Sequence, residues 1–123
     1  MATVNPTITD IKGNGQVMKF TWPLTTANAD GAPVPAKYAE YSDRTVYFVG
    51  TWGGATAAWQ GGDGTTWLPL TDPQGNAISK TADGIEAVTE TPELSRPVLT
   101  AVGAGATITV TLIARQGFRK GAI

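Results

Sequence analysis

Several stretches of the sequence alternate apolar and polar side chains with a period of two residues. The clearest is residues 107–114, in which every second side chain is Ile, Val, Leu or Ala and most of the others are threonine. Residues 16–22 and 44–49 repeat the pattern, with Phe20 and Trp22 on one face of the first stretch. Successive side chains of a strand point to opposite faces of a sheet, so each stretch is predicted to be a half-buried strand.

Short segments rich in glycine, aspartate and asparagine separate these runs at the intervals typical of β-sandwiches. A chain of 123 residues has the usual length of one domain. We therefore predict an all-β fold, a single-domain antiparallel β-sandwich. The turn segments are residues 12–15, 30–31, 63–64, 72–75, 83–84 and 103–105.

Three parts of the chain fall outside the strand pattern. Residues 1–15 are expected to form an N-terminal arm and residues 115–123 an extended C-terminal tail. Residues 24–37 contain two prolines, Pro33 and Pro35, which remove backbone donors and fix φ, so they predict a long loop.

The segment 50–70 concentrates three tryptophans among glycine, threonine and alanine. A three-residue hairpin loop at 62–64 would place Trp59 directly opposite Trp67, whereas a loop of two or four residues would put the two rings on opposite faces. We expect both rings in the core, where small alanines beside Trp59 leave room for it. Trp52 lies among glycines, and the sequence favours neither a core position nor a surface position for its side chain.

The chain has no cysteine and no histidine. This excludes disulfides, thiolate metal sites and hydrolysis by a Ser-His-Asp arrangement. Five of the six aspartates lie at or near turn segments, where carboxylates cap backbone amides. We therefore expect no enzyme activity, no catalytic residue, no cofactor and no metal. Arg96 is predicted either to pair with a carboxylate at a sheet edge or to be solvated.

The charge and hydropathy of the sequence argue against two kinds of binding partner, nucleic acids and membranes. The net charge is −1 and the basic residues do not gather into a stripe, so we expect no nucleic-acid binding. No apolar run approaches the ~20 residues that span a bilayer, and the first residues lack the pattern of a secretory signal. The expectation is a protein made in the cytoplasm that binds no membrane.

A family resemblance covers residues 43–116. The matching elements are the strand start at Asp43 and Arg44, the runs GTWGGAT, DGTTW and DPQGN, the dipeptide Arg96-Pro97 and the last Thr-Val strand. These segments resemble small decoration, or cement, proteins encoded in the head modules of tailed phages and prophages. The resemblance implies a jelly-roll-like sandwich that binds the outside of an assembled capsid, often as a homotrimer. It implies the major capsid protein as partner, the virion exterior as location and the bacterial host cytoplasm as the place of synthesis.

The residues expected to contact a partner lie outside the clear strand pattern and offer an apolar or arginine anchor. They are Pro33, Val34, Pro35, Tyr38, Tyr41, Phe118 and Arg119.

The alternative is a carbohydrate-binding or other structural module of a phage head fibre, neck or tail. That reading needs Trp52, or Tyr38 together with Tyr41, to be displayed on an open surface for stacking on sugar rings. A glycosidase acting through two carboxylates is the third and weakest reading, because no cleft is apparent in the sequence.

Overall fold

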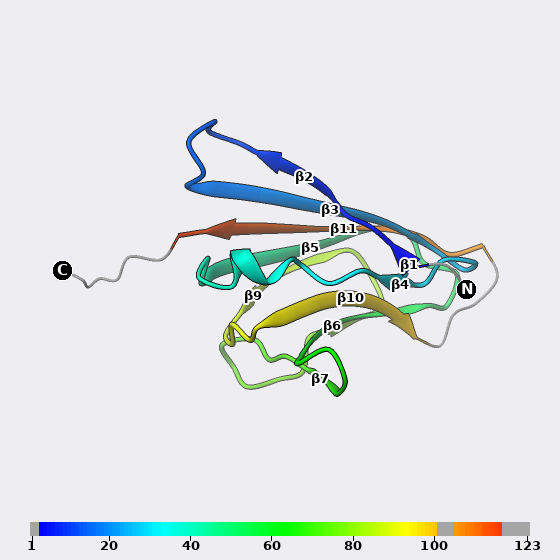
Figure 1. Cartoon of the computed structure of the whole chain (residues 1–123). Coiled ribbons are helices and arrows are strands. Elements are labelled where there is room, and N and C mark those ends of the chain that lie inside the picture. The colour runs from blue at the N-terminus through cyan, green and yellow to red at the C-terminus, as the bar shows by residue number, and fades with distance from the viewer. Residues whose placement is uncertain (1–2, 101–104, 117–123) are drawn as a thin grey trace.

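The computed structural model describes residues 3–100 and 105–116. In this part of the chain two β-sheets pack against each other (Figure 1). Sheet A has the order β1-β4-β10-β6-β7, with β8 also beside β6, and sheet B has the order β2-β3-β11-β5-β9. The strands of sheet A are β1 (Thr3–Val4), β4 (Asp30–Gly31), β6 (Thr56–Gly62), β7 (Trp67–Pro69), β8 (Ser79–Lys80) and β10 (Leu94–Thr100). Those of sheet B are β2 (Thr7–Asp10), β3 (Val17–Thr25), β5 (Asp43–Thr51), β9 (Gly84–Val88) and β11 (Thr107–Arg115).

The predicted single-domain β-sandwich is confirmed. The chain passes repeatedly between the two sheets, for example from β3 to β4, from β5 to β6 and from β9 to β10. One pairing differs from the predicted antiparallel pattern, since β1 runs parallel to β4.

The three alternating stretches form the longest strands of the described chain, β3, β5 and β11, which lie side by side in sheet B. Their alternate side chains point into the sandwich and are buried, which confirms the assignment of faces. The inward residues of these strands include Met18, Phe20, Trp22, Leu24, Val46, Phe48, Ile108, Val110, Leu112 and Ala114.

The predicted arm and loop are more regular than expected. Within the arm, β1 joins sheet A and β2 pairs with β3 in sheet B. Within the predicted loop 24–37, Leu24 belongs to β3, β4 bridges β1 and β10, and a 3-10 turn η1 (Ala36–Tyr38) begins at Ala36. A two-residue strand contains no alternation, so the sequence pattern could not reveal β1 or β4.

Trp22 and Trp59 meet at the centre of the sandwich, one from each sheet. Their rings cross edge to face at an interplanar angle of 70°, with centroids 5.5 Å apart, and both side chains are fully buried. This confirms the core position predicted for Trp59.

The core position predicted for Trp67 is wrong. The hairpin loop has four residues, 63–66, because Gly62 pairs with Trp67. Trp67 therefore shares its face with Gln60 and points away from Trp59, as the longer loop requires. The loop is held by Asp63, whose Oδ1 accepts the backbone N–H groups of Thr65 and Thr66, each at 2.9 Å.

Candidate functional site

The segment between β4 and η1 crosses one side of the sandwich and is tied to sheet A. The backbone N–H of Val34 donates to the carbonyl oxygen of Ser95 at 2.8 Å, and the carbonyl oxygen of Ala32 accepts a hydrogen bond from Trp22 Nε1 at 2.9 Å. These bonds hold the proline-rich segment against the core, so the prolines are displayed by a fixed backbone.

Aromatic rings fix η1 over the end of sheet B. Tyr38 stands edge-on to Phe20 at 5.1 Å and to Tyr41 at 5.5 Å between ring centroids. Lys37 Nζ lies 5.2 Å from the centroid of the Tyr38 ring. Ile8 of β2 is opposite Phe20 in the sheet, on its inward side, and stays 40% exposed. Exposed apolar surface therefore continues from η1 toward β2.

A buried arginine holds η1 in place through hydrogen bonds to backbone carbonyl groups. Arg44 donates from Nε to the carbonyl oxygen of Tyr41 at 2.7 Å, from Nη2 to that of Tyr38 at 2.9 Å, and from Nη1 to Ser95 Oγ at 2.9 Å. Burial lowers the pKa of Arg44 from its ordinary value to about 10, so the side chain is still protonated at neutral pH. Its partners are neutral, which makes Arg44 a structural clamp in this arrangement.

A second cation lies on an aromatic ring on sheet A. The guanidinium carbon of Arg96 is 4.2 Å from the centroid of the Trp67 ring, and Arg96 Nε donates to Gln60 Oε1 at 3.2 Å. The ring also rests on Gly62, where an added Cβ would come within 3.0 Å of it. The expectation that Arg96 pairs with a carboxylate at a sheet edge is wrong, because β10 is an inner strand. The half-buried Arg96 side chain lies instead on Trp67, which points outward beside it.

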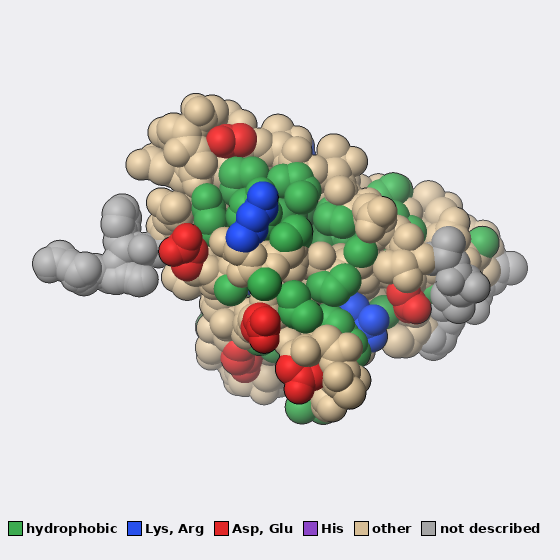
Figure 2. Space-filling model, in the orientation of Figure 1, with side chains coloured by type: hydrophobic (Ala, Val, Ile, Leu, Met, Phe, Trp, Pro, Cys, Tyr) green, Lys and Arg blue, Asp and Glu red, His purple; other side chains and the backbone are tan. Residues whose placement is uncertain are grey.

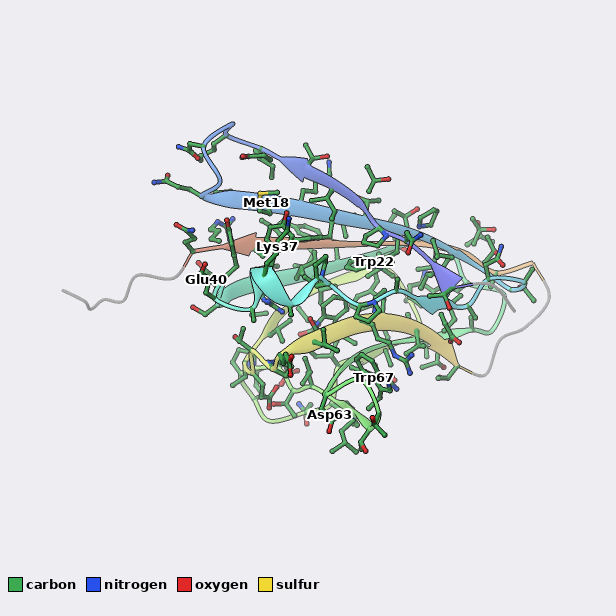
Figure 3. All side chains as sticks on the ribbon, viewed as in Figure 1. Met18, Trp22, Lys37, Glu40, Asp63 and Trp67 are labelled. Atoms are coloured by element: carbon green, nitrogen blue, oxygen red, sulfur yellow. The ribbon has the colours of Figure 1, made fainter. Side chains whose placement is uncertain are left out.

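These features form one surface, which we call the loop face: segment 32–38 together with Trp67 and Arg96. Figure 2 shows hydrophobic side chains across the middle of this side with basic side chains at two places among them, and acidic side chains above this middle, below it and toward both ends. Figure 3 places Lys37 and Trp67 on this side, with Glu40 and Asp63 near its margin. An apolar centre with aromatic and arginine anchors and a polar rim is typical of protein interfaces.

The predicted contact residues separate into three groups. Pro33, Pro35 and Tyr38 are half-buried in the segment that crosses the loop face. Val34 and Tyr41 are buried at 2% and 7% exposure, and the Tyr41 hydroxyl donates to the carbonyl oxygen of Gly15, so neither side chain is displayed for a partner. Both were chosen because they lie outside the strand pattern, yet the non-strand segment itself folds onto the core. Phe118 and Arg119 lie outside the described residues.

Sequence reasoning missed Lys37 and the stacked position of Trp67 and Arg96. The length of the hairpin loop could have revealed the stacked pair. A four-residue loop turns the Trp67 side chain outward, beside Arg96.

Several carboxylates cap turns, as the sequence predicted. Asp10 accepts the N–H groups of Gly13 and Gly15, and Asp72 accepts those of Gln74 and Asn76. Asp83 links two segments that are far apart in the sequence. Its Oδ1 accepts hydrogen bonds from Trp52 Nε1 at 2.8 Å and from the backbone N–H of Gly50 at 3.0 Å.

Three carboxyl groups have a pKa below the ordinary value. The hydrogen bond from Trp52, and then that from Gly50, lowers the pKa of Asp83. Backbone bonds from Thr66 and Thr65 lower the pKa of Asp63, and bonds from the Thr71 side chain and backbone lower that of Glu90. Each bond favours the charged carboxylate.

Within residues 3–100 and 105–116, no cluster of three or more acidic side chains could hold a metal ion. No helix in this part of the chain is long and apolar enough to cross a membrane.

The chain matches no protein-family model, no curated protein and no solved structure. The class that the fold defines is the β-sandwich.

Proposed function

We propose that this chain is a structural virion protein that binds the outer surface of a phage capsid through the loop face and stabilises it by cross-linking shell subunits. The observation that carries the proposal is the apolar middle of this face, with Lys37 over Tyr38 and Arg96 over Trp67. Aromatic and arginine anchors of this kind dominate binding energy at protein interfaces. The family resemblance of residues 43–116 supplies the partner, the major capsid protein.

Cross-linking relies on several modest contacts acting together. An oligomer with one loop face per copy engages several shell subunits at once, and its avidity exceeds the affinity of each contact. Rigid support of η1 by Arg44 favours this role, because a preorganised surface loses little entropy on binding.

The carbohydrate-binding alternative has weaker support. Tyr41 is buried, and Trp52 is half-buried with its Nε1 bound to Asp83. The guanidinium of Arg96 already lies over the Trp67 ring, so a sugar would have to displace it to stack there.

Co-sedimentation with empty heads that lack this protein tests the proposal. We expect saturable binding at a fixed ratio to the major capsid protein. Lys37→Glu should weaken binding at least about tenfold, since it reverses a charge at the interface. Lys12→Glu is the matched control, because Lys12 is an exposed lysine in the turn between β2 and β3, outside the loop face. Absence of binding to heads, with retention on a glycan array, would favour the alternative.

A further inference from the structure

The outer side of sheet B is a second surface, which the proposed function does not use. Its residues alternate with the core residues of β3, β5 and β11 and continue onto β2 and β9. We call it the threonine face, because its most frequent residue is threonine: Thr7, Thr9, Thr21, Thr25, Thr45, Thr51, Thr107, Thr109 and Thr111.

Apolar side chains stand among these threonines on one half of the face. Tyr47 is paired with Thr111 on one side and Ile85 on the other, and Val49 is the next outward residue along β5. Val49 is 53% exposed and Ile85 is 59% exposed. Two of the most exposed large aliphatic side chains of the described chain therefore lie on this one face.

The charges of the threonine face lie toward one end. Arg115 and Asp43 pair across the last row of the sheet, with Nη1 and Oδ2 4.0 Å apart, and Lys19 belongs to the next row. In β3, β11 and β5 the rows beyond them, from Thr21 to Thr25, are uncharged. At the β9 edge of these rows lies Asp83, whose Oδ1 accepts the N–H of Gly50 and Trp52 Nε1. A charged partner surface would lose hydration against these rows without gaining an ion pair.

The size of the face matches a small specific interface. Strands spaced about 4.8 Å apart with a rise of about 3.4 Å per residue give it an area of about 600 Å². Two such faces in contact reach about 1,200 Å², the lower end for specific protein interfaces. Threonine hydroxyls both donate and accept hydrogen bonds, so the surface is chemically complementary to itself.

We propose that the threonine face binds the same face of a second copy of this chain, forming a two-fold pair with sheet packed on sheet. The uncharged rows, the self-complementary hydroxyl groups and the area all suit this occupant. The two-fold axis of such a pair lies in the plane of the interface, so both copies can turn the same side toward a common surface. The pair is a different assembly from the trimer that the resemblance implies, and their masses distinguish them.

Sedimentation equilibrium of the full chain tests the pairing. We expect a concentration-dependent mass of twice 12.8 kDa for the unchanged protein. Val49→Glu, and independently Ile85→Glu, should raise the dissociation constant at least about tenfold, because each buries an unpaired carboxylate near Asp83 in the pair. Leu68→Glu is the matched control: Leu68 is 64% exposed on β7 of the other sheet, and this variant should pair normally.

Three outcomes overturn the proposal. The first is a monomer at every concentration. The second is a trimer whose mass neither the Val49 nor the Ile85 variant changes. The third is a dimer that only Leu68→Glu disrupts. Unfolding midpoints in urea confirm that the variants are folded. Because the experiment contains no heads, failure of the pairing is separate from failure of the proposed function.

Discussion

Arg44 and Ser95 join the two sheets through a buried hydrogen bond, from Arg44 Nη1 on β5 to Ser95 Oγ on β10, 2.9 Å long. The same guanidinium holds the carbonyl oxygens of Tyr38 and Tyr41. One side chain therefore connects sheet A, sheet B and the segment that forms the loop face.

Replacement of this arginine should loosen the loop face. Arg44→Met leaves the carbonyl oxygens of Tyr38 and Tyr41 without their donor, and we expect a loss of about 2–4 kcal/mol in unfolding free energy. Ser95→Ala, which removes one of the three bonds, should cost about 1 kcal/mol. Urea unfolding measures both. Equal stability of Arg44→Met and the unchanged protein would contradict the role of Arg44 as a clamp.

The two central tryptophans should respond differently to loss of their ring nitrogens. Trp22 Nε1 donates to the carbonyl oxygen of Ala32, whereas Trp59 Nε1 is buried without a hydrogen-bond partner in the described structure. Both phenylalanine variants lose packing, but only Trp22→Phe leaves an acceptor unpaired. We expect Trp22→Phe to be less stable than Trp59→Phe by about 1–2 kcal/mol. Urea unfolding of the two variants side by side decides this, and the reverse order would refute it.

The stacked pair on sheet A should matter more for binding than for folding. Arg96→Ala is expected to cost about 0.5–1 kcal/mol of stability, the size of an exposed cation–π contact. Binding to heads should fall at least about tenfold, as for an interface anchor. Lys12→Ala, a substitution of an exposed basic residue in the turn between β2 and β3, serves as the control. If both variants bind heads equally well, Arg96 is not an anchor.

Stability should fall in acid because of the lowered carboxyl pKa values. Asp83 has a lower pKa in the native state than its ordinary 3.8, so its contribution is complete above that value and disappears as pH falls through the native pKa. Asp63 and Glu90 act in the same direction. Urea midpoints measured from about pH 7 to about pH 2.5 should decline less for Asp83→Asn than for the unchanged chain. A parallel decline would contradict this assignment.

The C-terminal residues predicted to contact the shell can be tested by truncation. Removal of residues 117–123 deletes Phe118 and Arg119 and leaves every described residue of β11 in place. We expect weaker co-sedimentation with heads and an unchanged urea midpoint. Head binding at the original affinity would exclude the tail as an arm.

The three long strands of sheet B could be predicted because each one shows its own alternation of apolar and polar residues. Alternation in residues 16–22, 44–49 and 107–114 specifies which side chains are buried, since a strand with one buried face must repeat every two residues. The same logic identified Trp59 as a core residue and the aspartates as turn caps.

Contacts between residues distant in the sequence determined the features that the sequence did not predict. Whether Trp67 faces inward depended on one additional residue in a hairpin loop, which reverses the side of the sheet. Val34 and Tyr41 are core residues because a segment without alternation folds across the sandwich and is held there by Arg44 and Ser95. Local residue patterns do not predict such contacts. The free energy that holds these side chains in the core comes from burial against strands that are distant in the chain.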